Sequence, residues 1–344
     1  MHPREVVMSD PGRRRVAAID CGTNSLRLLI ADWHPTRSEL TEIARRMEIV
    51  RLGQGVDATG QLAPEALART FAMLEEYGRV IADSGSEAVR LVATSATRDA
   101  SNAEEFASGV RRILNVDPEV LSGDEEAYLS FLGATAELAG AAPDGARPEP
   151  PFLVVDIGGG STEFVFGGAI TPGMADDGAN SLAALSVNIG SVRLTERHLV
   201  ADPPEPAQIA AATADVDSAL ESVAAAMPAA SARTLVGLAG SVTTLTAVAL
   251  GMPRYDPGTV HHARITAARL HEVARDLLSQ DHDERAKNGA IHPGRVDVIG
   301  AGALILDRIL GRFGFTEMLT SEHDILDGAA WSIVTARAGT PRRR

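Results

Sequence analysis

Two short glycine-containing segments hold the residue types that bind phosphate. Asp20-Cys-Gly-Thr-Asn-Ser25 and Asp156-Ile-Gly-Gly-Gly-Ser161 share the pattern Asp-x-Gly-x-x-Ser and align without a gap, 136 residues apart (156 minus 20). A carboxylate at a strand end can hold a divalent cation, directly or through water. Glycine lets the backbone come close to an anion, and consecutive N–H groups with hydroxyls form an anion-binding nest. Two such turns predict a site that holds a chain of phosphates from both sides.

The repeat extends beyond the turns, because apolar runs flank both of them at matching positions. Self-similarity at the size of a domain predicts two structurally related lobes. The two copies differ in chemistry, since Arg27 stands where the second copy has Glu163. Two plain β-hairpins with glycine turns are the structural alternative.

Two familiar nucleotide-binding patterns are excluded. Neither turn continues into G-x-G-x-x-G before a helix, so a Rossmann site does not fit. The only lysine, Lys287, lies in Ala-Lys-Asn-Gly rather than Gly-Lys-Ser/Thr, so a Walker A loop does not fit either.

A third glycine segment, 237–244, has the sequence Gly-Leu-Ala-Gly-Ser-Val-Thr-Thr. A predicted strand leads into it and a predicted helix follows. Gly240 and Ser241 would then lie at a helix N-terminus, where backbone N–H groups suit a phosphate or ribose oxygen. A simple helix cap is the alternative for this segment.

Apolar runs, proline and capping signals predict the elements that position these turns. The first half predicts strands over 16–20, 26–32, 40–52 and 88–93 and helices over 64–82, 102–114 and 122–138. The last two helices begin with capping boxes, Asn102 with Glu105 and Ser122 with Glu125. Glu126, next to the second box, is left free to point elsewhere.

A Pro/Gly/Ala segment over 140–151 predicts the boundary between the halves. The second half predicts strands over 152–156, 162–166 and 234–238, a loop over 167–180, and helices over 206–227, 241–250, 267–279, 295–312 and 325–336. We expect lobes over 15–139 and 151–324, a C-terminal helix over 325–337 that completes the first lobe, and disordered tails over 1–14 and 338–344.

Composition narrows the class of protein. The chain has 344 residues, with 46 acidic and 32 basic side chains and a formal net charge of −14, which disfavours a general nucleic-acid binder. No apolar run is long enough to span a bilayer, so no membrane partner is expected. The single cysteine, Cys21, allows no intramolecular disulfide. These features favour the cytoplasm.

Several runs together resemble the exopolyphosphatase / guanosine pentaphosphate phosphohydrolase (Ppx/GppA) family. They are IDCGTNSLRLLI, ATSATRDASN, SGDEEAYL, VVDIGGGSTEFVF, LAGSVTTLTAV, RVDVIGAGALIL and SEHDILDGAA, and they span about residues 15–336. The resemblance implies an α/β, actin-like (ASKHA) fold with duplicated ribonuclease-H-like lobes and an interlobe cleft. It also implies Mg²⁺-dependent (or Mn²⁺-dependent) release of orthophosphate. The chain resembles the short, two-domain form of the family.

The resemblance also implies roles for particular residues. Glu126 matches the carboxylate that activates the attacking water, Asp156 and Glu163 match the metal-associated carboxylates, and Arg98 matches a substrate-facing arginine. Arg27 and Arg193 are weaker candidates. The implied substrate and phosphate contacts are Asp20, Gly22, Thr23, Asn24, Ser25, Gly158, Gly159, Gly160, Ser161, Thr162, Gly240 and Ser241.

The leading hypothesis is an exopolyphosphatase that acts on inorganic polyphosphate, with a homodimer cleft as one way to build a basic channel. A pppGpp 5′-phosphohydrolase would use the same chemistry, but aromatic residues are only 4% of the chain and no base-stacking side chain stands out. A non-catalytic polyphosphate or alarmone sensor is one further alternative, and a sugar kinase or actin-like ATPase is another. Adjacent His261 and His262 would face opposite sides of a strand, and His323-Asp324 lacks an upstream His partner, so neither predicts a metal site.

Overall fold

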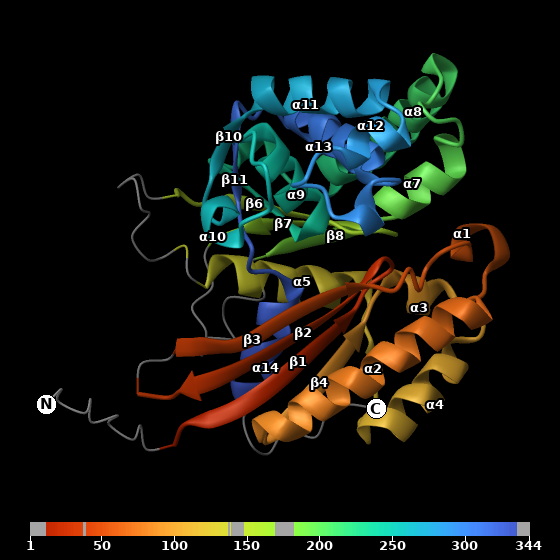
Figure 1. Ribbon diagram of the computed structural model, residues 1–344. Helices are drawn as coiled ribbons and strands as arrows, with labels where there is room; N and C mark the ends of the chain where they lie inside the picture. Colours follow the sequence, from red (N-terminus) through yellow and green to blue (C-terminus); the bar gives the residue numbers. More distant parts are fainter. Residues whose placement is uncertain (1–11, 37–38, 137, 139–147, 169–181, 336–344) are drawn as a thin grey trace, which may run out of the picture.

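Each predicted turn joins the first two strands of a separate β-sheet (Figure 1). The computed structural model describes residues 12–36, 39–136, 138, 148–168 and 182–335. The predicted tails lie outside the described residues except for 12–14, and most of the predicted linker and of the loop over 167–180 also lies outside them. Within the described residues, no helix is long and apolar enough to cross a bilayer.

The first sheet has the strand order β3-β2-β1-β4-β5. Its first three strands form an antiparallel meander, and the next two add in parallel on the other side of β1. These strands are β1 (Arg14–Cys21), β2 (Ser25–His34), β3 (Glu39–Ile49), β4 (Ala88–Ala93) and β5 (Glu119–Val120).

The second sheet repeats this order as β8-β7-β6-β9-β11 and adds β10 at its edge. The meander is again antiparallel, and β9 and β11 are parallel to β6. The strands are β6 (Phe152–Ile157), β7 (Thr162–Gly167), β8 (Ala183–Val187), β9 (Thr234–Leu238), β10 (Arg264–Thr266) and β11 (Glu317–Thr320). The shared order confirms the predicted duplication of ribonuclease-H-like lobes in an actin-like α/β fold.

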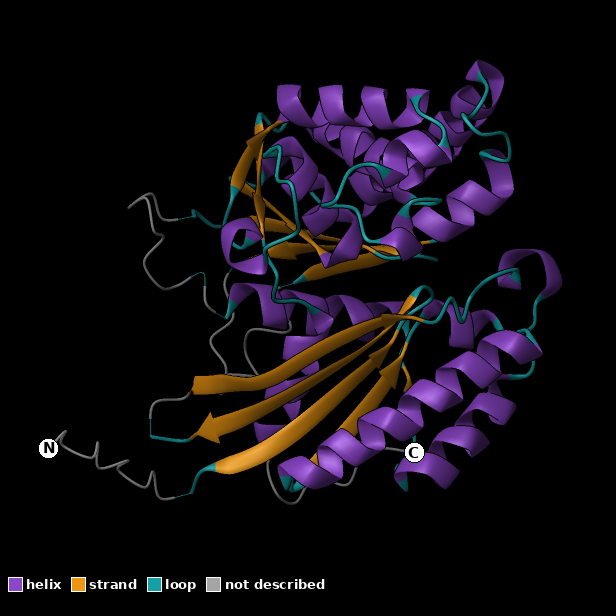
Figure 2. Cartoon of the chain, viewed as in Figure 1, coloured by secondary structure: helices purple, strands orange, loops and turns teal. Residues whose placement is uncertain are grey.

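Helices cover the outer face of each sheet (Figure 2). The first lobe has α1 (Val56–Thr59), α2 (Pro64–Ser84), α3 (Ser95–Asp99) and α4 (Ala103–Leu114); α2 and α4 close its core around Leu74, Tyr77 and Phe106. The second lobe has a larger core beneath α8, α11 and α13. Its helices are α7 (Ser191–His198), α8 (Pro206–Ala226), α9 (Ala239–Ala249), α10 (Pro257–Val260), α11 (Ala267–Ser279), α12 (His282–Ala286) and α13 (Ile299–Phe313).

Two helices, α5 (Gly123–Thr135) and α14 (Ile325–Thr335), pack against each other between the lobes. Gly133 and Gly328 allow this close crossing, because a Cβ at either position would lie about 2 Å from a backbone oxygen of the other helix region. Phe131 of α5 packs in the cluster of the second sheet, and Leu326 of α14 packs in that of the first. The sequence placed α5 with the first lobe, but its apolar side chains lie mainly against the second.

Two local expectations need correction. Asn102 precedes α4 but makes no capping hydrogen bond, because its side-chain amide pairs with the backbone N–H and carbonyl of Leu62 instead. The helix expected over 295–312 begins only at Ile299, after a 3₁₀ turn over Pro293–Arg295. The second capping box is confirmed, since Ser122 and Glu125 bond each other's backbone N–H groups.

Candidate active site

The two glycine turns meet around a small cavity of about 70 Å³. Both turns close in the same way, because the N–H of Gly22 donates to the carbonyl of Ser25 and that of Gly158 to the carbonyl of Ser161, each at 3.0 Å. The predicted residues that line the cavity are Asp20, Gly22, Thr23, Asn24, Ser25, Glu126, Asp156, Gly158, Gly159, Ser161, Gly240 and Ser241. The fold therefore brings all three glycine segments to one place.

Four predicted residues lie beside this cavity without lining it: Gly160, Thr162, Glu163 and Arg98. A Cβ on Gly160 would lie 2.6 Å from the Ser95 hydroxyl oxygen, so this glycine is pressed against the first lobe. The hydroxyl of Thr162 donates to the carbonyl of Ile189 at 2.7 Å and is used structurally.

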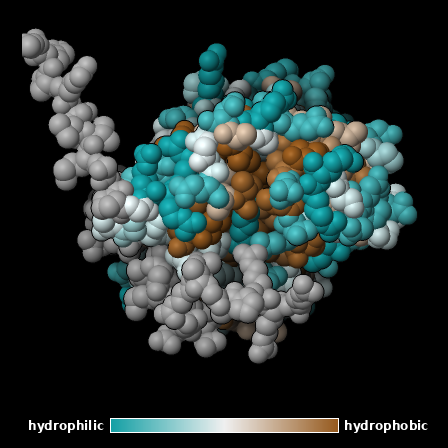
Figure 3. All heavy atoms as spheres, turned by 90° about the horizontal axis from the view of Figure 1, so that it is seen from below, coloured by the Kyte–Doolittle hydropathy of each residue, from teal (hydrophilic) through white to brown (hydrophobic). Residues whose placement is uncertain are grey.

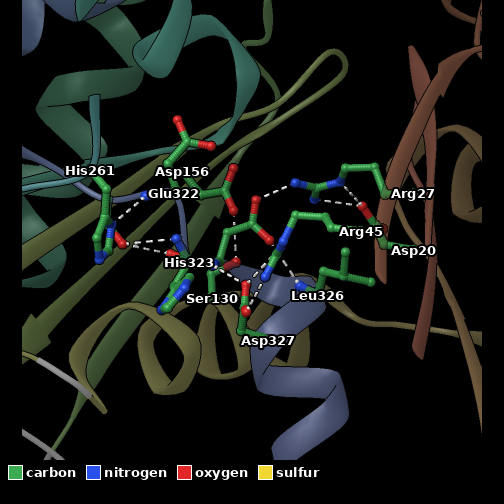
Figure 4. A network of polar contacts seen from close by, with 12 residues as sticks. Asp20, Arg27, Arg45, Ser130, Asp156, His261, Glu322, His323, Leu326 and Asp327 are labelled. Carbon is green, nitrogen blue, oxygen red and sulfur yellow. Dashed lines mark hydrogen bonds and ion pairs between the residues drawn. The ribbon is translucent and has the colours of Figure 1, made fainter. Parts of the chain in front are cut away.

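The first turn carries a buried ion pair. Asp20 lies opposite Arg27 in the β1–β2 ladder, and the guanidinium donates to Asp20 Oδ2 from Nε at 2.9 Å and from Nη2 at 2.6 Å. Figure 4 shows the Arg27 guanidinium directed at Asp20. Arg27 also pairs with Asp324, from the segment that leads from β11 into α14. The sequence does not predict a metal site at His323-Asp324, and in the structure the carboxylate of Asp324 forms an ion pair with Arg27.

The second turn carries two carboxylates at the equivalent place. Asp156 lies opposite Glu163 in the β6–β7 ladder. Ser130 of α5 donates to Asp156 Oδ2 and Ser186 of β8 donates to Glu163 Oε1, each at 2.7 Å. Burial and then the neighbouring Glu163 charge raise the pKa of Asp156 to about 8, and burial also raises the pKa of Glu163. Two buried carboxylates side by side call for a cation or a proton.

These carboxylates suit a hard, oxygen-seeking cation such as Mg²⁺. Glu163 Oε2 and Asp20 Oδ1 are buried and have no hydrogen-bond partner among the residues that the structure describes. Mg²⁺ keeps several waters and takes only one or two carboxylates from a protein. The described residues contain no cluster of three His, Cys, Asp or Glu side chains arranged around an ion.

Glu126 reaches the cavity from the first turn of α5. The capping box fixes this helix start, and Gly123 lets it approach β8, because a Cβ there would lie 2.4 Å from Ser186 Cβ. Glu126 is 7% exposed, and burial followed by the charge of Glu163 raises its pKa well above the ordinary value. Arg98 Nη1 donates to Glu126 Oε2 at 3.0 Å and to the Leu121 carbonyl. Arg98 therefore contacts the predicted base, rather than lining the phosphate cavity.

Arg295 is a site residue that the sequence reasoning missed. It lines the cavity and lies so close to Gly240 that a Cβ there would be 2.1 Å from its Nη2. Within the described residues, its guanidinium makes one hydrogen bond, from Nη1 to the Thr244 hydroxyl at 3.3 Å, and forms no ion pair with a carboxylate. Burial lowers its pKa. Its position in the run RVDVIGAGALIL was the available signal.

A second cavity of about 400 Å³ adjoins the first and shares Arg27, Ala239, Gly240 and Arg295 with it. Its other walls include the apolar side chains of Met47, Pro257, Ile291, Pro293 and Leu326, together with Arg45, Arg46, Tyr255 and His292. The site thus has a small polar chamber between the turns and a larger, more apolar one beside it.

Comparisons with known proteins identify a family whose profile this chain matches. Residues 29–335 match the profile of the Ppx/GppA phosphatase family. Exopolyphosphatase 2 of Mycobacterium tuberculosis is 46% identical over 330 residues, which cover 93% of this chain and 98% of the relative. A guanosine-5′-triphosphate,3′-diphosphate pyrophosphatase of Aeromonas hydrophila is 27% identical, over 92% of this chain and 59% of the relative.

Solved structures give the same result. The crystal structure of an exopolyphosphatase-like protein has a TM-score of 0.86 at 42% identity and covers 93% of this chain and 98% of that one. The Aquifex aeolicus member of the Ppx/GppA family has a TM-score of 0.75 at 32% identity, over 95% of this chain and 100% of that chain.

Proposed function

Because this chain belongs to the Ppx/GppA phosphatase family, we propose that it is an exopolyphosphatase that releases orthophosphate from the end of inorganic polyphosphate. The observation that carries the proposal is the meeting of two phosphate-binding turns around one cavity, with a buried carboxylate, Glu126, in its wall. A polyphosphate end suits such a cavity because residues of both lobes line it.

In the proposed reaction, the backbone N–H groups and hydroxyls of the two turns bind the terminal phosphates. The carboxylate of Glu126 accepts a proton from a water molecule as that water attacks the terminal phosphorus. The phosphoanhydride P–O bond breaks, orthophosphate is released, and the shortened chain leaves with the bridging oxygen. Asp156 and Glu163 would hold Mg²⁺ (or Mn²⁺), which neutralises phosphate charge when it is bound.

A second candidate function is pppGpp 5′-phosphohydrolase activity. The second cavity supports it, because largely apolar walls next to a phosphate site suit a nucleoside attached to the phosphates. A non-catalytic polyphosphate or alarmone sensor is a third reading, and the retained set of Glu126, Asp156 and Glu163 speaks against it.

We also propose a homodimer in the cytoplasm. On the face of the first lobe seen in Figure 3, hydrophobic residues gather near the centre, with hydrophilic ones above and to either side of them. Contiguous apolar patches of this kind often mark association surfaces. The single cysteine, Cys21, is buried and free, which suits a reducing compartment. Sedimentation of the full chain tests the dimer; a monomer at micromolar concentration would overturn it.

The decisive experiment measures phosphate release by the purified full chain with Mg²⁺. Long polyphosphate, tripolyphosphate, pppGpp and ATP are offered separately, and Glu126→Gln is the matched inactive variant. We expect release from polyphosphate that depends on Glu126. Release from pppGpp alone would favour the second candidate. Binding of polyphosphate without release from any substrate would identify a sensor.

A further inference from the structure

Arg193 contacts both lobes with one side chain. It lies in the first turn of α7, and its Nε donates to the carbonyl of Gly160 at 2.6 Å. Its Nη1 binds Asp57 of α1 and its Nη2 binds Asp99 of α3, each at 2.5 Å. The Arg193 side chain is 12% exposed. A single guanidinium thus joins the second phosphate turn to two carboxylates on the other side of the cleft.

Backbone N–H groups at the start of α7 donate hydrogen bonds to the carbonyls of the second turn. The backbone N–H of Ser191 donates to the carbonyl of Gly158 at 2.9 Å, and those of Val192 and Arg193 donate to the carbonyl of Gly159 at 2.8 and 3.0 Å. The side chain of Arg193 takes the third carbonyl, that of Gly160. Gly190 makes this approach possible, because a Cβ there would lie 2.5 Å from the carbonyl carbon of Gly159.

This arrangement sets the direction of the opposite backbone groups. In a planar trans peptide, the C=O of one residue and the N–H of the next point in opposite directions. Carbonyls directed toward α7 therefore leave the N–H groups of Gly159, Gly160 and Ser161 directed away from it. Among the described residues, the N–H groups of Gly159 and Gly160 have no hydrogen-bond acceptor. Consecutive N–H groups left open in this way form an anion nest.

The two carboxylates that hold Arg193 belong to segments that also hold the first turn. Asp99 ends α3, and Ser95 at the start of that helix shares a hydrogen bond of 2.9 Å with the hydroxyl of Thr23. Asp57 follows Gly53, whose N–H donates to the carbonyl of Thr23 at 2.8 Å. The position of Arg193 therefore depends on where the first lobe places Thr23.

We propose that Arg193 is a positioning residue that couples closure of the two lobes to the geometry of the second phosphate turn. It acts through the carbonyl of Gly160 and does not touch the reacting atoms. When the lobes separate, Asp57 and Asp99 move away, the guanidinium loses its fixed position, and the Gly160 peptide is free to rotate. The nest is then complete only while the lobes are closed. This inference rests on the phosphatase function proposed above.

Arg197 provides a matched control on the same helix. It pairs with Asp57 and with Asp215 of α8, so it also bridges the lobes, but it makes no contact with the turn. If Arg193 served only to clamp the lobes, loss of either arginine would have the same kind of effect. If it positions the turn, the two variants will differ.

The test compares Arg193→Gln with Arg197→Gln in steady-state phosphate release. We expect kcat to fall about 10²-fold in Arg193→Gln, with a smaller change in KM, because a displaced turn affects the bound transition state most. Arg197→Gln should keep kcat within about twofold of wild type, since the turn is unchanged. Arg193→Lys keeps the charge but cannot make all three contacts at once, so its kcat should lie between those of Arg193→Gln and wild type.

Hydrogen exchange of the substrate-free protein gives a readout that does not need activity. The amide hydrogens of a peptide covering 157–162 should exchange faster in Arg193→Gln than in wild type. In Arg197→Gln their exchange rate should equal that of wild type. Asp99→Asn, a milder change at an exposed position, should shift exchange in the same direction. It serves as the test if Arg193→Gln does not fold. Equal exchange in wild type and both Arg193→Gln and Asp99→Asn would overturn the proposal. If wild type releases no phosphate, the proposed function is wrong. The exchange result would still test the positioning role of Arg193.

Discussion

Asp156 lies directly opposite Glu163 in the ladder between the first two strands of its sheet. The equivalent ladder position in the first lobe pairs an acid with a base, Asp20 with Arg27. The same pair of ladder positions therefore holds different charges in the two lobes. The first lobe neutralises its buried carboxylate internally, and the second leaves two carboxylates that require a cation or protons.

The first prediction is a pH-dependent stabilisation by Mg²⁺. A carboxylate whose folded-state pKa is raised favours the fold while it is protonated, and that contribution is lost as the pH rises through the folded pKa. In the folded protein, burial raises the pKa of Asp156 to about 8. Without metal, the free energy of unfolding should therefore be lower at pH 8 than at pH 6. Saturating Mg²⁺ should raise Tm by roughly 5 °C at pH 8 and clearly less at pH 6, as measured by calorimetry.

Glu163→Gln is the control for this effect, because it removes one of the two charges and keeps the size of the side chain. We expect it to raise the Tm of the metal-free protein at pH 8 and to abolish most of the Mg²⁺ shift. Equal Mg²⁺ shifts in wild type and Glu163→Gln would show that the ion binds elsewhere.

The second prediction separates two neighbouring glutamates on α5. Glu126→Gln should lower kcat by at least about 10²-fold with little change in KM, because the base acts only in the transition state. Glu125→Ala should cost about 1 kcal/mol of stability by breaking the capping box and leave kcat near that of wild type. Phosphate release and urea unfolding of both variants test this. Near-normal kcat in Glu126→Gln would remove it as the base.

The third prediction concerns the acidic limb of the pH profile. Burial raises the pKa of Glu126, while the charge of Arg98 opposes that rise. A base must be ionised to act, so activity should increase with pH as Glu126 loses its proton. Arg98→Met removes the opposing charge and should move the acidic limb of kcat to higher pH by roughly one unit. Arg98→Lys should move it less, and an unchanged limb in Arg98→Met would mean that another group sets it.

The turns and their flanking strands were predictable because they depend on local sequence: apolar runs, glycine spacing and the capping box at Ser122. Features that depend on tertiary contacts were not. Asn102 looks like a helix cap in sequence, yet Leu62 offers its amide a better pair of backbone partners. The tight crossing of α5 and α14 depends on Gly133 meeting a segment nearly 200 residues later. The contact of Arg295 with Gly240 is equally invisible until both segments fold.

The last prediction concerns this same Arg295. A buried guanidinium without a carboxylate partner destabilises a fold unless an anion binds to it, and here a phosphate of the substrate would supply that anion. Arg295→Met should therefore leave the Tm of the substrate-free protein equal to or above that of wild type, while KM for polyphosphate rises about tenfold.

Arg308→Met is a suitable control for Arg295→Met, since Arg308 pairs with Asp217 on the surface of the second lobe, away from both cavities. Its KM should match that of wild type. Calorimetry without substrate and steady-state kinetics on the same preparations decide the matter, and a fall in Tm with unchanged KM would show that Arg295 is structural.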